Sequence, residues 1–223
     1  MMMSLFSVFD PTSFFGVYLN WIIIFVVVFF LPNNIFFTFS VYVSFWKMLY
    51  EMVKNVFFEI ASSKFKIIIL LSLVSFIYLC LVNIVGLFPF VFTGSAHLIM
   101  TLGLGLVMWM SFFLMGWLKD FKHSAAHLVP EGSPLMLSPL LVIIESVSHL
   151  IRPFTLSVRL AANMMAGHLI MGLLSMISMV SFSSLSVSLM MQTILLMLEF
   201  SVSVIQSFVF SILLLLYALE YYY

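Results

Sequence analysis

The stretch ESVSHLIRPFTLSVRLAANMMAGHL, residues 145–169, places one carboxylate, two arginines and two histidines inside an otherwise apolar run. An ionisable side chain at the centre of a bilayer costs about 3 kcal/mol on insertion scales, so such residues are rare there and usually serve a function. The stretch therefore predicts a long membrane helix in which the few polar positions carry the chemistry.

The composition of the whole chain predicts an integral membrane protein. Of its 223 residues, 65% are hydrophobic and only 7% are charged, unlike an ordinary soluble domain. Eight basic and eight acidic residues cancel, so no net field attracts nucleic acid, and the expected surroundings are lipid. The sequence lacks a phosphate-cradling loop, and its 18 methionines suit packing, so we expect no cofactor and no metal.

Three apolar segments in the first part of the chain fit membrane spans, which need about 20 residues each. The first covers residues 14–31. Residues 67–118 hold two more, one running from 67 to about 92 and one from about 98 to 118. Before them, residues 33–66 mix lysines and glutamates with aromatic residues, which predicts an amphipathic helix lying at the membrane interface.

The C-terminal half predicts a helical hairpin. Residues 134–180 read as one helix, which at 1.5 Å per residue would be about 70 Å long, more than twice the hydrocarbon core of a bilayer. Such a helix must tilt steeply or kink at a proline or glycine. The serine-rich segment SFSSLS then separates it from a second long apolar run. We expect a tilted antiparallel hairpin over residues 134–220 with its turn near residue 183.

These segments together predict an all-α integral membrane protein with a single membrane domain, residues 1–223. We expect about five membrane helices, one interfacial amphipathic helix and the long hairpin. Lysines gather between the first two spans and again after the third, while the link before the third span has none. By the positive-inside rule, these basic segments face the matrix or cytoplasm and the N-terminus lies on the opposite side.

Helical geometry gathers the polar residues of the hairpin into two stripes. At about 100° per residue, five residues of the first helix fall within an arc of about 80°: Glu145, His149, Arg152, Arg159 and Asn163. On the second helix, Glu199, Ser203 and Gln206 share one face because they are separated by steps of four and three.

Two pairs across the hairpin give the same register. Arg159 opposite Gln206, and His168 opposite Glu199, both place the turn near residue 183, where the serine-rich segment already placed it. The agreement favours a hairpin in which these side chains face one another.

The residue types suit proton transfer around a fixed charge. Arginine stays protonated under ordinary conditions, so Arg159 is not a proton carrier, whereas histidine and buried glutamate titrate near neutral pH. His168 with Glu199, and Glu145 with His149, would form two relays on either side of it. Apart from the terminal EYYY, which reads as an interface belt, the predicted spans hold no further carboxylate. A partner protein must therefore supply a mobile acid.

Several motifs resemble one known family. VRLAANMMAGHL at 158–169, preceded by LVIIES and followed by LEFSVSVIQSFVF, is similar to subunit a of the rotary F-type ATP synthase in its mitochondrially encoded form. NIVGLFPF and HLVPEGSPLMLSPLLVIIE extend the likeness over residues 83–213. The first 80 residues are similar only in hydropathy and layout.

The resemblance implies a proton-conducting stator that works against a rotor ring of small hairpin subunits. Each ring subunit would carry a proton-binding carboxylate, which Arg159 meets, with Asn163 one turn on and Gln206 facing the arginine. Peripheral-stalk and accessory membrane subunits are further implied partners, and this chain would bind no nucleotide itself. The implied location is the mitochondrial inner membrane, with the N-terminus on the intermembrane-space side and the C-terminus on the matrix side.

The same resemblance distributes the remaining polar residues between two proton routes. His168 and Glu199 match the polar pair on the proton-rich side, and Glu145 matches an acid near the release side. Arg152 and His149 have no fixed family role, but they lie on the same stripe and remain candidates. For both, a structural part in helix packing or lipid contact stays open.

Two other classes of membrane protein fit the hydropathy. A haem or quinone subunit of a respiratory complex needs histidines paired across two helices, but His149 and His168 lie on one helix. A secondary proton transporter would usually show an internal repeat and its own mobile acid, and the sequence shows neither. A purely structural scaffold leaves the aligned polar residues unexplained.

Overall fold

The computed structural model describes residues 9–10, 18–29, 31, 40–61, 65–88, 91–119, 121–122, 125, 128–129, 137–179 and 182–222. All regular elements within these residues are helical, which confirms the prediction of an all-α fold. The α-helices are α1 (Ile22–Phe29), α2 (Val41–Ile60), α3 (Lys66–Gly86), α4 (Leu98–Lys119), α6 (Ser138–Ser178) and α7 (Phe182–Tyr222). Two 3-10 turns, η2 (Leu19–Trp21) and η4 (Gly94–Ala96), precede α1 and α4.

Within the described ranges, four helices are long and apolar enough to cross a membrane: α3, α4, α6 and most of α7. The predicted first span is described only in part, because residues 14–17 and 30 lie outside the described residues. In the described part, α1 has eight residues, which measure only about 12 Å along a helix axis.

The second span ends earlier than expected. The sequence predicts a helix to about residue 92, but α3 stops at Gly86, and the N–H of Leu87 bonds back to the carbonyl of Ile84. Proline has no N–H and disfavours helical geometry in the residue before it, so Pro89 opposes any continuation of the helix. The chain then passes through η4, and α4 begins at Leu98, as the sequence predicts.

The hairpin consists of α6 and α7, each 41 residues long. Its turn begins at Met179 and α7 begins at Phe182, so most of SFSSLS is helical and the turn precedes residue 183. The reason is that serines here satisfy their hydroxyls within the helix: Ser186 Oγ donates to the carbonyl of Ser183 at 3.0 Å. Serine is therefore no signal of a break in this segment.

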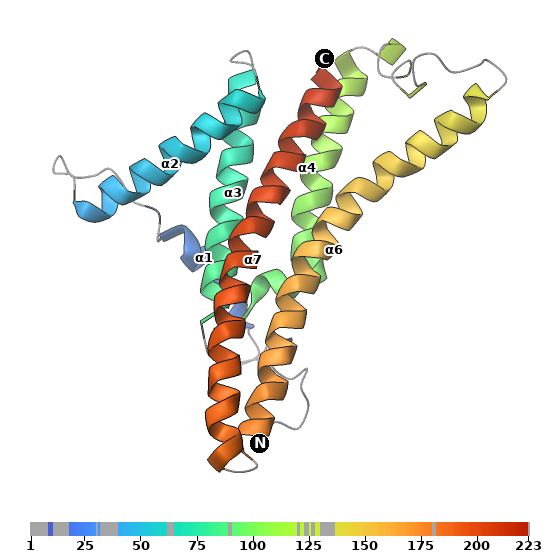
Figure 1. Ribbon diagram of the computed structural model, residues 1–223. Helices are drawn as coiled ribbons and strands as arrows, with labels where there is room; N and C mark the ends of the chain where they lie inside the picture. The colour runs from blue at the N-terminus through green and yellow to red at the C-terminus, as the bar shows by residue number, and fades with distance from the viewer. Residues whose placement is uncertain are drawn as a thin grey trace.

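Figure 1 shows that α7 is the helix on which the other long helices pack. It packs against α3, α4 and α6, and α4 packs against both hairpin helices. Near the hairpin turn α6 and α7 lie side by side, and toward the C-terminus of α7 they diverge (Figure 1). The amphipathic α2 projects outward from the end of α3, with its side chains largely exposed (Figure 1).

The long α6 bends partway along its length (Figure 1). Pro153 lies inside this helix and has no N–H to donate to the carbonyl four residues earlier, the usual cause of a helix bend. Ser157 donates its hydroxyl to the carbonyls of Pro153, at 3.0 Å, and Phe154, at 2.9 Å. Pro153 thus lies about two turns before Arg159.

The main contact between α2 and the rest of the fold is made by Phe57, with Val53 and Phe58 packed against the same cluster. Phe57 is fully buried and is the only buried residue of α2. It stacks on Phe208 of α7 with ring centroids 6.2 Å apart and belongs to a cluster with Ile69, Leu73 and Leu215. Van der Waals packing of this kind holds membrane helices together.

Replacing Phe57 with alanine should detach α2 from α3 and α7. Removing a buried phenylalanine costs about 3–5 kcal/mol in packed cores. We expect F57A to lower the temperature at which the detergent-solubilised chain aggregates, whereas F45A, which removes an exposed ring from the same helix, should leave it unchanged. Equal melting of the two variants would contradict the anchoring role.

Candidate functional site

Arg159 lies on the exposed face of α6. Within the described residues, ion pairs link other charged groups but none involves this arginine. Its exposed neighbours on the same face include two small residues, Ala162 and Ala166. Small side chains let another helix approach closely, so Arg159 presents its charge on a surface that a neighbouring helix could contact.

The amide of Gln206 pairs with Asn163. Asn163 Nδ2 donates to Gln206 Oε1 at 3.2 Å, although the sequence register placed Gln206 opposite Arg159. That register assumes helices that run strictly antiparallel. Because α6 and α7 diverge away from the turn (Figure 1), the pairing moves by one helical turn along α6.

His168 points toward α3 and the N-terminal segment. Its ring hydrogen-bonds to the backbone of Gly86 and meets Phe9 edge-to-face, with ring centroids 6.3 Å apart. Its Nε2 atom is buried and, within the described residues, has no hydrogen-bond partner. No ion pair between His168 and Glu199 is present among the described residues, and the relay predicted for this pair would need water between the two groups.

The carboxylate of Glu199 lies directly against Gly167. A Cβ built on this glycine would come within 2.6 Å of Glu199 Oε1 and 2.7 Å of its Cδ. The carboxylate thus occupies the space that any larger residue at 167 would take. Oε1 is buried without a hydrogen-bond partner among the described residues, which is costly unless the group is neutral or meets water.

A cavity of about 200 Å³ opens beside this carboxylate. Its polar lining comes from three helices: Asn83 of α3, Asn163 of α6, and Glu199, Ser203 and Gln206 of α7. Asn83 donates its Nδ2 to the carbonyl of Ser203 at 3.5 Å, while its Oδ1 is buried without a partner in the described structure. Most of the remaining lining is apolar, but the cavity has room for several water molecules beside these polar groups.

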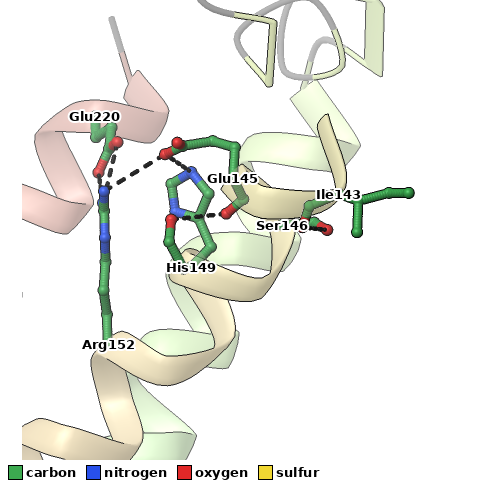
Figure 2. Close-up of polar contacts among 7 residues, drawn as sticks. Ile143, Glu145, Ser146, His149, Arg152 and Glu220 are labelled. Carbon is green, nitrogen blue, oxygen red and sulfur yellow. Dashed lines mark hydrogen bonds and ion pairs between the residues drawn. The ribbon is translucent and has the colours of Figure 1, made fainter. Parts of the chain in front are cut away.

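A second polar cluster lies at the other end of the hairpin (Figure 2). Glu145 Oε1 is 3.4 Å from His149 Nε2 and 3.6 Å from Arg152 Nη2. Arg152 Nη1 reaches across to α7, where it donates to Glu220 Oε2 at 2.8 Å. The side chain of His149 is almost fully buried, and the other three are about one-third exposed.

The structure therefore sorts the predicted site residues into two groups on either side of Arg159. Asn163, Gln206 and Glu199 line one cavity, with His168 behind it, and the release-side candidates form the cluster of Figure 2. Sequence reasoning missed Asn83 and Glu220. Asn83 stands at the start of the NIVGLFPF motif, a signal that could have found it, whereas Glu220 was assigned to the membrane interface.

Comparison with known proteins gives one consistent result. The family described as ATP synthase A chain matches residues 13–218. ATP synthase subunit a of Drosophila yakuba is 41% identical, with 99% of each chain covered. Subunit a of Artemia franciscana is 40% identical over 99% of this chain and 100% of the relative. The chain belongs to the ATP synthase subunit a family.

Proposed function

We propose that this chain conducts protons along two half-channels, which open on opposite sides of the membrane and are separated by Arg159. As a member of its family, the chain is the proton-translocating membrane stator subunit of an ATP synthase. With four helices of membrane length and insect and crustacean relatives, it is a multi-pass protein of the mitochondrial inner membrane.

One observation carries the proposal: Arg159 is exposed on α6 and has no acid of its own chain beside it within the described residues. A guanidinium keeps its charge in any protein environment, and a charge in a membrane needs a counter-charge or water. A carboxylate on a neighbouring protein would supply that counter-charge. The small residues Ala162 and Ala166 would allow such a partner helix to come close.

The uptake half-channel is the cavity that contains Glu199. It lies toward the hairpin turn, about 12 Å from Arg159 along α6. Its carboxylate, amides and hydroxyl can bind water and pass a proton to an acid at the edge of the cavity. His168 lies behind Gly167 and would bring protons from the η4 side.

The release half-channel is the cluster around Glu145. It lies about 21 Å from Arg159 in the opposite direction along α6. Glu145 and His149 are in contact and can exchange a proton. Because Arg159 carries no proton across the gap, an acid on a rotor ring must travel from one half-channel to the other. Each proton that crosses a potential of 100 mV releases about 2.3 kcal/mol for that rotation.

The proposed orientation follows from the loop lysines. The N-terminus and the hairpin turn would face the intermembrane space, and the C-terminus of α7 would face the matrix. Figure 1 draws the end of α6 and the start of α7 at one end of the fold and the last turns of α7 at the other. The proposed partners are a rotor ring of small hairpin subunits, a peripheral stalk, accessory membrane subunits and lipid.

Removing the charge of Arg159 tests the separation of the half-channels. We expect R159A to abolish coupled ATP synthesis and ATP-driven proton pumping in reconstituted vesicles, because the ring carboxylate loses its counter-charge. The complex should still assemble on native gels. T155A, one turn earlier on the exposed face of α6, is the matched control and should retain activity. Normal coupled synthesis in R159A would refute the assignment.

Exchange of His168 and Glu199 tests whether the two act in one route. H168A and E199A should each slow proton uptake, because each removes a group that can take up a proton. The exchanged variant, H168E with E199H, should recover part of the rate, as measured by initial proton flux at fixed potential. Full activity in both alanine variants would remove this pair from the pathway.

Adding a methyl group at Gly167 tests the position of the Glu199 carboxylate. G167A should displace Glu199 and lower proton flux several-fold, since relay geometry matters on the scale of an ångström. G103A is a suitable control because a Cβ there meets nothing within 4 Å. Equal proton flux in G167A and G103A would show that proton conduction does not depend on the position of the Glu199 carboxylate beside Gly167.

A further inference from the structure

Glu220 of α7 makes an ion pair that crosses the hairpin (Figure 2). Arg152 Nη1 donates to both carboxylate oxygens, at 2.8 Å to Oε2 and 3.2 Å to Oε1. The pair joins α6 and α7 on the side where the two helices diverge (Figure 1). Glu220 thus belongs to the protein interior as much as to the membrane interface.

The same guanidinium also faces the acid of the release half-channel. Arg152 Nη2 lies 3.6 Å from Glu145 Oε1, and the plane of the guanidinium is further fixed by the ring of Tyr217, 5.4 Å away. Nη1 of Arg152 therefore contacts the Glu220 carboxylate, and Nη2 faces the Glu145 carboxylate (Figure 2).

We infer that Glu220 and Arg152 are positioning residues for proton release, and that they hold the Glu145 carboxylate against His149 by sharing one guanidinium between two acids. The inference rests on the proposed function, because it takes Glu145 as the acid of the release half-channel. Neither Glu220 nor Arg152 carries the proton.

The distances explain why two acids are needed. A guanidinium bonded to Glu145 alone would form a tight ion pair and hold that carboxylate as an anion. Here Arg152 is closer to Glu220, at 2.8 Å, than to Glu145, at 3.6 Å. Glu145 Oε1 is then left as close to His149, at 3.4 Å, as to the arginine. The guanidinium therefore orients the Glu145 carboxylate without holding it in a hydrogen-bonded ion pair.

The formal charges of the cluster in Figure 2 balance when it holds one added proton. With His149 neutral, its two carboxylates and one guanidinium sum to a single negative charge, and one proton on His149 or Glu145 brings the sum to zero. The groups that bear on this balance are Glu145, His149 and Arg152 of α6 and Tyr217 and Glu220 of α7. From α4, which packs against both helices, the only titratable side chain is Lys119, its last residue.

A purely mechanical role for the ion pair makes a different prediction. If Arg152 and Glu220 only tie two diverging helices together, any pair of opposite charges at these positions should serve equally well. If they position Glu145, the guanidinium must remain on α6 beside that carboxylate. Exchanging the two residues separates these readings.

The test uses the assembled ATP synthase in liposomes, with the rate of ATP synthesis measured while the pH is varied on each side in turn. We expect E220Q to slow synthesis roughly threefold, the scale of one partly exposed ion pair, and to shift the pH dependence on the side of the α7 C-terminus. E59Q, which removes an exposed acid of α2, is the control and should keep the native rate and pH dependence.

The exchanged variant R152E with E220R decides between the two roles. It should assemble, because the pair across the hairpin is restored, but its pH dependence should stay abnormal, because Glu145 now faces a second carboxylate. A native pH dependence in this variant, or in E220Q, would overturn the inference. If E220Q fails to assemble, the exchanged variant alone gives the answer.

E145Q separates this inference from the proposed function. Full proton flux in E145Q would remove Glu145 from the release half-channel and so refute that part of the proposed function. Loss of flux in E145Q combined with native behaviour in E220Q would refute only the positioning role.

Discussion

A guanidinium that cannot lose its proton, placed in a membrane, constrains everything else in this structure. Arg159 is exposed on α6 and lacks an acid of its own chain within the described residues. Its charge must therefore meet either water or, as proposed, an acid of a neighbouring protein. Among the described residues, Glu145 and His149 lie to one side of it along the hairpin, and His168 and Glu199 lie to the other. Glu145 and Gly167 lie far apart along α6 because this helix is long enough to carry both residues, with Arg159 between them.

The fold keeps these groups apart by packing around α7. That helix contacts α3, α4 and α6, and it supplies Glu199 and Gln206 to one group and Glu220 to the other. Close packing of α6 on α7 near the turn lets a glycine and a carboxylate meet. Farther along, the helices diverge (Figure 1), and only a side chain as long as arginine spans the distance to Glu220.

Much of the architecture could be predicted because hydropathy and helix length are local properties. The long hairpin and the start of α4 follow from runs of apolar residues. The contacts across the hairpin could not be predicted as well, because a fixed register holds only for parallel axes. Gln206 bonds to Asn163, one turn beyond Arg159, and the ring of His168 bonds to the backbone of Gly86. The serine-rich segment misplaced the turn because its hydroxyls bond within the helix.

The hydrogen bond between Asn163 and Gln206 has a consequence for Arg159. Gln206 Oε1 already accepts a hydrogen bond from Asn163, which competes with any bond from the guanidinium to the same oxygen, and no ion pair among the described residues holds Arg159. In the proposed mechanism, the long side chain of Arg159 would be able to lean toward an approaching carboxylate of the ring and follow it through part of its passage. The attraction would then be spread over an arc of travel.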